Sequence, residues 1–275
     1  MIDDEALVWI DGDLRPVGEA AISPFDHGLV VGDGAFETLQ ILDRTPFAIE
    51  RHLRRLQVTL AALAIESPSP ELLRDAMGSV VHANDLVVGK LRLTVTGGAG
   101  PLSSGTPNGP PTVIVAAQPA SAPPVPAAVT VPWTRNESGA LVGLKTTSYA
   151  ENVRALRYAH DQGAGEALFA NTRGELCEGT GTNVFVVIDG QLLTPPLSSG
   201  CLAGVTRELV MELVDVAEAT LPIDAVDHAD EVFLTSSTRN VQALHQVNGR
   251  PLAPGPRTAA TADVFAALLA RDLDP

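Results

Sequence analysis

The sequence predicts a mixed α/β protein of the α+β class, with a small N-terminal α/β domain and a larger C-terminal domain. Two observations indicate this class. Strand patterns alternate irregularly with amphipathic helical patterns, without the strict strand–helix–strand repetition of a doubly wound sheet. A proline-rich segment inside the 275 residues separates two stretches of different pattern.

The domain boundary is predicted at residues 118–128, QPASAPPVPAA. Four prolines in this short segment exclude a helix or a central strand, because proline lacks the backbone N–H and has a restricted φ. We therefore expect a small domain over residues 1–117, an extended linker over 118–128 and a large domain over 129–275.

In the first domain, leucines at helical spacing predict a helix over residues 50–64. Ser69-Pro70 is a typical helix start and predicts a second helix to about residue 84. The expected strands cover residues 7–10, 35–42, 45–49, 91–96 and 112–117, and a loop rich in glycine and proline covers 97–111.

In the second domain, Asp189-Gly190 and Asn248-Gly249 are hairpin turn signals. Apolar residues at helical spacing indicate three helices. The expected elements are strands over residues 167–170, 183–188, 191–194, 231–235 and 241–247, and helices over 149–162, 206–219 and 257–273.

The composition excludes several classes of partner. Asp and Glu total 33 against 18 Lys and Arg, a net charge of −15, whereas a nucleic-acid or anionic-membrane partner calls for a basic face. Cys177 and Cys201 lack the number and spacing of a disulfide framework or metal site. The acidic start, Met-Ile-Asp-Asp-Glu, lacks the basic region of a signal peptide, and no apolar run is long enough to span a bilayer. We expect a soluble, cytoplasmic protein.

Lysine is the rarest basic residue of the chain. Only Lys90 and Lys145 are lysine, and the other basic residues are arginine, which cannot form an imine. Lys145 lies among small polar residues just before a predicted helix. This context suits a reactive amine, but it equally suits an ordinary loop lysine.

Several further segments could contact a flat, anionic ligand. Glu178 lies in a glycine-containing turn, and a carboxylate there could keep a pyridine nitrogen protonated. Thr206 follows a glycine turn that opens a helix, which is a potential anion site. Ser236 and Ser237 follow a strand, and Arg55 borders an apolar helix stripe and could face a buried anion. Each segment also has an ordinary structural explanation: a solvated turn, a capped helix or a basic helix face.

Other candidate motifs lack the required context. The glycines at 97–100 are followed by Pro101 rather than a helix, which argues against a dinucleotide loop. His27 and His52 lack metal-ligand spacing, so no metal site is predicted. The sequence also contains no nucleophile-elbow serine motif.

Taken in order, these segments resemble the signature of the class IV aminotransferases, the fold-type IV pyridoxal-phosphate enzymes. The family includes branched-chain aminotransferases, D-amino acid transaminases, (R)-selective amine transaminases and aminodeoxychorismate lyases. The resemblance spans nearly the whole chain. It is carried by Val31-Gly32-Asp33-Gly34-Ala35-Phe36-Glu37-Thr38, Glu50 to Leu56, Glu178, Asn183-Val184-Phe185, Leu193-x-Pro195, Leu202-x-Gly204-Val205-Thr206-Arg207, and Glu231-Val232-Phe233 leading into Ser236-Ser237.

The resemblance implies a pyridoxal 5′-phosphate cofactor in a cleft between two domains, held by Lys145 as a Schiff base. The freed Lys145 amine would then move a proton between the substrate α-carbon and C4′ of the cofactor. Glu178 would pair with the pyridine nitrogen and Tyr149 would reach the O3′ oxygen. The implied phosphate ligands are Arg55, Val205, Thr206, Ser236 and Ser237.

The implied substrates are a small amine and a 2-oxo acid, but the substrate residues are mixed in type. Phe36-Glu37-Thr38 resembles the lyase and D-amino acid sequences, whereas Arg92 aligns better with a branched-chain carboxylate ligand. Val31 replaces an aromatic residue of relatives, and Thr238 completes the substrate candidates. We rank a transaminase of D-amino acids or (R)-amines beside an aminodeoxychorismate lyase, with a branched-chain L-amino acid transaminase third. The resemblance also implies a homodimer.

Overall fold

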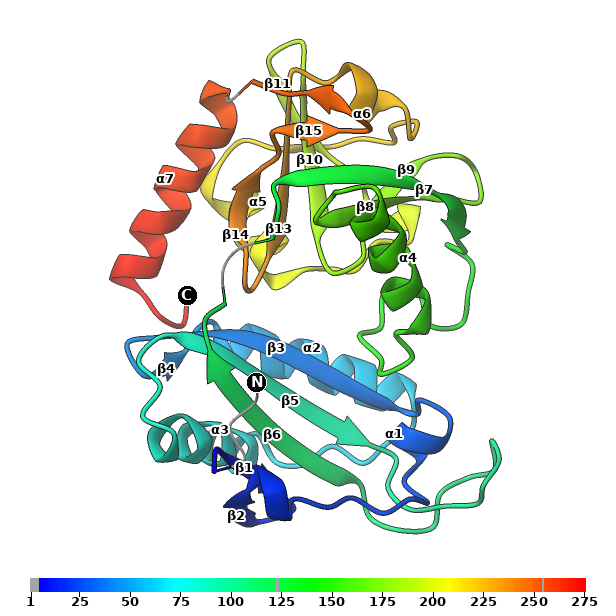
Figure 1. Cartoon of the computed structure of the whole chain (residues 1–275), viewed down its shortest axis with the longest axis vertical. Helices are drawn as coiled ribbons and strands as arrows, with labels where there is room; N and C mark the ends of the chain where they lie inside the picture. The colour runs from blue at the N-terminus through cyan, green and yellow to red at the C-terminus, as the bar shows by residue number, and fades with distance from the viewer. Residues whose placement is uncertain (1–4, 122–123, 254) are drawn as a thin grey trace. The chain divides into compact units, whose positions relative to one another are not determined.

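The computed structural model describes residues 5–121, 124–253 and 255–275 and confirms the mixed α/β class (Figure 1). The chain forms two compact units. The first comprises Met1–Ser121, Leu144–Tyr149 and Leu273–Pro275, and the second comprises Ala122–Gly143 and Ala150–Asp272. The segment that carries Lys145 therefore belongs to the first unit, although most of its neighbours in sequence belong to the second.

The first unit is a six-stranded antiparallel sheet in the order β2-β1-β6-β5-β3-β4. The helices α2 and α3 contact one face of it (Figure 1). Its strands are β1 (Leu7–Ile10), β2 (Asp13–Pro16), β3 (Gly34–Leu42), β4 (Thr45–Pro46), β5 (Gly89–Thr96) and β6 (Thr112–Pro119). Its helices are α1 (His27–Val30), α2 (Ile49–Ala62) and α3 (Pro70–Ala83), with a 3-10 turn, η1, at Val17–Glu19.

Side chains of β3 alternate between the two faces of this sheet. Leu39 and Ile41 are fully buried in the core that α2 and α3 cover. Glu37 has the same parity and therefore faces the same helices, whereas Phe36 points to the opposite face. A single strand thus carries a buried carboxylate on one face and an aromatic ring on the other.

The second unit contains two five-stranded sheets, ordered β12-β11-β10-β13-β14 and β16-β15-β7-β8-β9. The first sheet comprises β10 (Asn183–Ile188), β11 (Gln191–Thr194), β12 (Ala217–Glu218), β13 (Glu231–Ser236) and β14 (Asn240–Ala243). The second comprises β7 (Ala127–Arg135), β8 (Glu166–Asn171), β9 (Leu176–Gly179), β15 (Gln246–Val247) and β16 (Arg250–Pro251). The helical segments are α4 (Ala150–Asp161), η2 (Leu197–Ser199), α5 (Val205–Leu213), α6 (Ala225–His228) and α7 (Pro256–Arg271).

Most predicted elements agree with the structure to within two residues, but several details differ. The helix predicted over 206–219 is wrong in length: α5 ends at Leu213, because residues 217 and 218 pair with β11. The strand predicted over 241–247 is split into β14 and β15, which belong to different sheets. The strands β7 and β9 were not predicted.

The predicted linker overlaps two strands, since β6 runs to Pro119 and β7 starts at Ala127. Residues 122 and 123 of the linker, and the acidic residues 1–4, lie outside the described residues. The division into domains at 118–128 stays a prediction.

A buried ionic network joins β3 to α2 in the first unit. The Glu37 carboxylate is fully buried and accepts hydrogen bonds from Arg55 Nε at 2.8 Å and from Arg55 Nη2 at 2.6 Å. It also accepts one from His52 Nδ1 at 2.6 Å. Burial alone would raise the pKa of Glu37, but the Arg55 charge and the hydrogen bonds from Arg55 and His52 outweigh it and lower the pKa to about 2.

The same surroundings keep His52 neutral. Burial lowers the pKa of His52, and the charges of Arg55 and Lys145 lower it further, whereas Glu37 opposes the shift. Near neutral pH the network therefore contains a negative Glu37, a positive Arg55 and a neutral His52 ring that donates a hydrogen bond to the Glu37 carboxylate.

The network predicts a specific pH dependence of stability. The pKa of Glu37 is lowered on folding, so its stabilising contribution is complete above the unfolded value near 4.5 and is lost as the pH falls toward about 2. In urea unfolding, the stability difference between the wild type and Glu37→Gln should therefore shrink between about pH 6 and about pH 3. Glu50→Gln removes an exposed carboxylate of α2 that binds Arg74 and serves as the control. A difference that stays constant over this range would contradict the role assigned to Glu37.

Candidate functional site

The backbone of Lys145 is held at two points in the first unit. Its carbonyl accepts a hydrogen bond from Phe36 N at 3.0 Å, and its N–H donates to Thr59 Oγ1 on α2 at 3.3 Å. The following residue, Thr146, forms a bridge with Ala35. The lysine segment therefore lies along β3, and the position of Lys145 is set by a strand and a helix distant in sequence.

Glycine at position 34 permits this close approach. A Cβ at Gly34 would lie 2.9 Å from the Val95 carbonyl oxygen and 3.1 Å from Thr147 Oγ1. Thr147 N also donates to the Gly34 carbonyl at 2.8 Å. A larger residue at Gly34 would therefore displace the segment that carries Lys145.

The Lys145 amine lies against aromatic side chains. Its Nζ is 4.4 Å from the centroid of the Phe36 ring and 5.8 Å from that of Tyr149, and the two rings meet edge to face. The Arg92 guanidinium carbon lies 3.6 Å from the centroid of the same Phe36 ring. A second cation and an apolar surface near the amine are conditions that make a lysine nucleophilic.

The remaining predicted residues of the first unit are Arg55 and Val31. Arg55 bonds to a buried anion, the Glu37 carboxylate, which is one of the two alternatives that the sequence left open for this side chain. Val31 is exposed at the end of α1. The first unit thus brings Lys145, Tyr149, Phe36 and Arg92 into one cluster and holds Arg55 on the opposite face of β3.

Glu178 lies on β9 in the second unit and is mostly buried. Its carboxylate accepts a hydrogen bond from Leu202 N at 2.9 Å, and Arg135 Nε lies 3.4 Å from it. These partners stabilise the ionised carboxylate. The strand β9 pairs with β8, where Phe169 lies opposite Glu178.

The helix α5 begins directly after Gly204, and no side chain caps it. Val205 and Thr206 are buried in its first turn, where backbone N–H groups have no partner within the helix. A Cβ at Gly204 would lie 2.0 Å from Asn183 Oδ1, so a larger residue here would displace the Asn183 side chain. The start of α5 therefore suits an anion such as a phosphate.

A third segment, Ser236-Ser237-Thr238, follows β13 and is positioned by a buried ion pair. Ser236 Oγ accepts a hydrogen bond from Arg239 N at 3.2 Å. The Arg239 side chain lies 3.1 Å from the buried Glu166 carboxylate, which also accepts from Thr180 N. Glu166 and Arg239 thus tie the serine turn to the loop that follows β9.

The predicted residues of the second unit converge around Asn183. This residue pairs with Thr235, which precedes the serine turn, and its side chain donates to the Leu202 carbonyl at 2.8 Å. Leu202 N in turn bonds to Glu178. The strand β9, the residues before α5 and the end of β13 therefore meet around Asn183 within the second unit.

The buried ionic residues Glu37, His52, Glu166 and Arg239 had no predicted role. Glu37 could have been found from the strand pattern, because it has the parity of the buried Leu39 and Ile41. Glu166 and Arg239 are distant in sequence, and only the tertiary structure pairs them.

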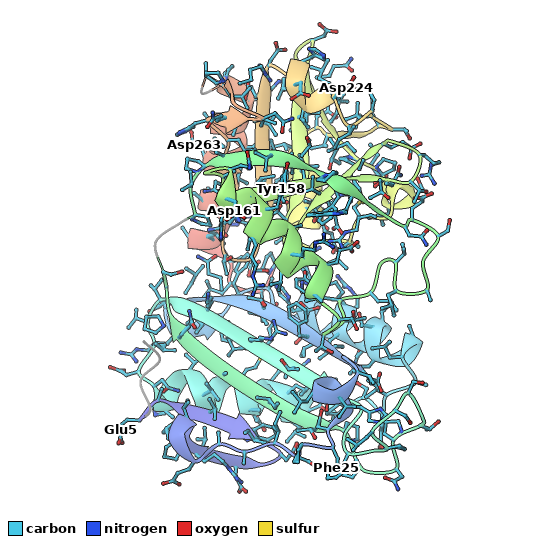
Figure 2. All side chains as sticks on the ribbon, turned by 45° about the vertical axis from the view of Figure 1, so that its right-hand side comes forward. Glu5, Phe25, Tyr158, Asp161, Asp224 and Asp263 are labelled. Atoms are coloured by element: carbon cyan, nitrogen blue, oxygen red, sulfur yellow. The ribbon has the colours of Figure 1, made fainter. Side chains whose placement is uncertain are left out.

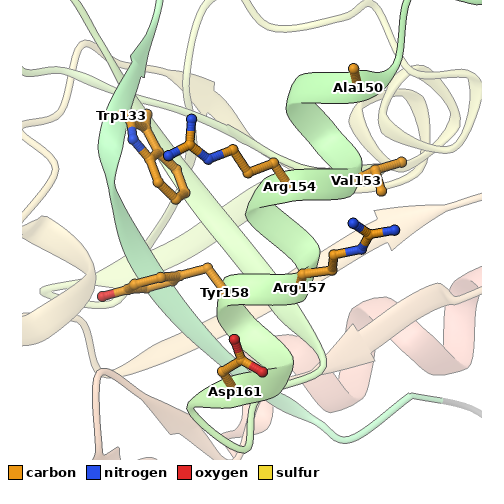
Figure 3. A pocket seen from close by; sticks show the side chains of 7 residues that line it. All are labelled: Trp133, Ala150, Val153, Arg154, Arg157, Tyr158 and Asp161. Atoms are coloured by element: carbon orange, nitrogen blue, oxygen red, sulfur yellow. The ribbon is translucent and has the colours of Figure 1, made fainter.

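A surface pocket of about 480 Å³ also lies in the second unit, between α4 and β7 (Figure 3). Arg154 lies over the Trp133 ring, and Tyr158 meets that ring edge to face. The pocket is lined by none of the predicted site residues.

Within the described residues, no group of His, Cys, Asp and Glu has the arrangement of a metal site. In the same part of the chain, no helix is long and apolar enough to cross a membrane. Both cysteines are free and buried.

Comparison with known proteins identifies the family. Residues 34–247 match the model of amino-transferase class IV. A bifunctional aminodeoxychorismate lyase / D-amino acid transaminase of Mycobacterium tuberculosis is 30% identical over an alignment of 292 positions, gaps included, covering 96% of this chain and 97% of that protein. Other relatives are named aminodeoxychorismate lyase, D-alanine aminotransferase and branched-chain-amino-acid aminotransferase.

Solved structures agree with this assignment. The branched-chain aminotransferase of Thermoproteus uzoniensis with norvaline has a TM-score of 0.89 and 27% identity, covering 96% of this chain and 94% of that one. The PLP-bound form of a hypothetical aminotransferase of M. tuberculosis has a TM-score of 0.85 and 28% identity, covering 95% and 98%. The chain belongs to the class IV aminotransferases and is a pyridoxal-phosphate-dependent enzyme of fold type IV.

Proposed function

We propose that this enzyme is a transaminase that moves an amino group between a D-amino acid or (R)-amine and a 2-oxo acid. The environment of Lys145 supports amino-group transfer, and the resemblance of Phe36-Glu37-Thr38 to D-amino acid sequences favours the D-amino acid or (R)-amine class. The Lys145 backbone is bonded to both β3 and α2, and its amine lies beside Phe36 with Arg92 on the same ring. A fixed primary amine beside a second cation suits a substrate that carries both an amine and a carboxylate.

The donor set of the chain fits pyridoxal phosphate. The bound cofactor supplies a carbonyl that condenses with amines and a ring that accepts electrons from the substrate α-carbon. Lys145 carries the cofactor and, when displaced by substrate, moves a proton between that α-carbon and C4′. The ionised Glu178 holds a proton on the pyridine nitrogen, and Tyr149 binds the O3′ oxygen.

The phosphate is assigned to the donors that surround the two turns of the second unit and to one arginine of the first. The N–H groups at the start of α5 and the hydroxyls of the serine turn bind it without adding net charge. These ligands are Val205, Thr206, Ser236, Ser237 and Arg55.

Arg92 is assigned to the substrate carboxylate. Its guanidinium is stacked on Phe36, which also lies beside the Lys145 amine, so a carboxylate bound by Arg92 places the substrate amine close to Lys145. Phe36, Val31 and Thr238 complete the proposed substrate contacts. This assignment favours amino acids over amines that lack a carboxylate.

An aminodeoxychorismate lyase is the second candidate. The M. tuberculosis relative, which is similar over nearly its whole length, has both activities in its name. Both reactions begin with removal of the α-proton and differ in what then leaves the substrate. The lyase would release 4-aminobenzoate and pyruvate, whereas the transaminase would release a 2-oxo acid.

Lys145→Ala should prevent covalent attachment of the cofactor, because among the described residues no other primary amine lies in the cluster with Phe36 and Tyr149. Borohydride reduction of the wild type followed by peptide mass spectrometry should find the cofactor on Lys145. Lys90→Ala, which removes the other lysine of the chain, should retain the attachment. A modified Lys90 peptide would refute the assignment.

The substrate class can be determined with four compounds. D-alanine or an (R)-amine with a 2-oxo acid should give turnover, L-leucine should give little, and aminodeoxychorismate should release no 4-aminobenzoate. Arg92→Gln should raise KM for D-alanine by roughly tenfold, because a charge-assisted hydrogen bond is lost, and should leave the (R)-amine nearly unchanged. Release of 4-aminobenzoate without amine turnover would establish the lyase, and rapid turnover of L-leucine alone would establish the branched-chain enzyme.

We also propose that the enzyme is a homodimer, because the first unit exposes an apolar patch. Phe25, which is labelled in Figure 2, lies at the surface of this unit. It is 50% exposed, Leu29 is 63% exposed, and Leu102 in the neighbouring loop is 68% exposed. Hydrogen bonds from Gly100 N to the Phe25 carbonyl and from His27 N to the Gly98 carbonyl join these segments. Clustered exposed apolar side chains on an otherwise acidic protein are typical of an interface.

Light scattering should give twice the chain mass of 28.7 kDa. The double variant Leu29→Glu/Leu102→Glu should shift the protein toward monomer, because it places charges within a buried apolar surface. Val58→Glu, an equally exposed position on α2, should leave the mass unchanged. A wild-type monomer at micromolar concentration would contradict the dimer.

A further inference from the structure

The Glu37 carboxylate occupies one edge of the Arg55 guanidinium. Arg55 Nε donates to Oε1 at 2.8 Å and Nη2 donates to Oε2 at 2.6 Å. A guanidinium is planar and has a second edge, which carries Nη1. Two parallel bonds along the first edge prevent rotation of the group, so Glu37 determines the direction of the second edge.

Glu37 is itself held in place. His52 Nδ1 donates to Oε2 at 2.6 Å, and both Glu37 and His52 are buried. A carboxylate can only accept, so His52 carries its proton on Nδ1. The carboxylate therefore has three donors around it and little freedom to turn.

Arg55 and Lys145 share a direct structural connection. Thr59 Oγ1 donates to the Arg55 carbonyl at 3.2 Å and accepts from Lys145 N at 3.3 Å. Phe36, the neighbour of Glu37 on β3, binds the Lys145 carbonyl. The backbone of Phe36 thus holds Lys145, and the side chain of Glu37 holds Arg55. Phe36 and Glu37 are adjacent residues of β3.

We propose that Glu37 is a positioning residue for the cofactor phosphate, which it does not touch, and that it acts by directing the Nη1 edge of Arg55. The inference rests on the proposed role of Arg55 as a phosphate ligand. Without the Glu37 carboxylate, the guanidinium keeps its charge but can adopt other rotamers, so an oriented phosphate donor is lost. Covalent capture by Lys145 does not use this bond.

The test compares the binding of pyridoxal phosphate with that of pyridoxal, which lacks the phosphate. Apoprotein variants are titrated with each compound, and the absorbance of the lysine-bound form gives the dissociation constant. Glu37→Gln should raise Kd for pyridoxal phosphate by roughly tenfold or more and change Kd for pyridoxal by less than about twofold. Arg55→Lys should show the same selectivity, and the double variant should be no weaker than Arg55→Lys alone.

Two further variants, Glu37→Asp and Glu50→Gln, serve as controls. Glu37→Gln leaves Arg55 buried beside a neutral partner, so Glu37→Asp is measured as well; it keeps the charge but is too short to hold both Arg55 bonds and His52. Glu50→Gln removes an exposed carboxylate that binds Arg74 through two bonds and should change neither Kd. Thermal unfolding of each apoprotein confirms that it is folded.

The outcomes separate the inference from the function on which it rests. Equal weakening of both ligands by Glu37→Gln and Glu37→Asp would show a general structural role and overturn the inference. Unchanged binding of both ligands would also overturn it. If Arg55→Lys does not discriminate between the ligands, the phosphate role of Arg55 fails, and the inference fails with it. Selectivity in Arg55→Lys but not in the Glu37 variants would overturn the inference alone.

Discussion

The packing of the first unit depends on the Glu37 carboxylate, which has no access to water. Burial of Glu37 is unfavourable unless its charge is paired and its oxygens are hydrogen-bonded, and Arg55 and His52 meet both requirements. Because these partners lie on α2 and Glu37 lies on β3, the pairing sets the register between helix and strand. The same strand and helix also provide the two backbone contacts of Lys145, which come from Phe36 and Thr59 and not from the buried carboxylate itself.

The second unit uses the same principle. Glu166 is buried and is bound by Arg239 and by the loop after β9, and Arg239 in turn bonds to Ser236. In each unit a buried carboxylate pairs with an arginine: Arg55 is itself a proposed phosphate ligand, and Arg239 bonds to the proposed ligand Ser236. In an enzyme of net charge −15, a few rigid and correctly directed donors must bind an anionic cofactor, since the overall field opposes it.

The proposed substrate contacts differ in their surroundings from the proposed cofactor ligands. Phe36 contacts Lys145, Tyr149 and Arg92, but Arg92 is exposed and Val31 lies at the surface of its unit. The names of family members include a lyase, D-alanine aminotransferases and branched-chain-amino-acid aminotransferases. We therefore propose that specificity depends on residues that the buried networks do not constrain.

The sequence by itself determined the mixed class, most elements and the family, because periodicity, turn residues and ordered motifs are local properties of the chain. It left open whether Arg55 faces a buried anion or solvent, and it did not identify Glu37 as the partner. Only the tertiary structure decided that the Lys145 segment packs along β3, that Glu166 pairs with Arg239 and that α5 ends at Leu213. Such contacts join residues far apart in sequence, and their energy comes from burial and pairing in three dimensions, which no local pattern records.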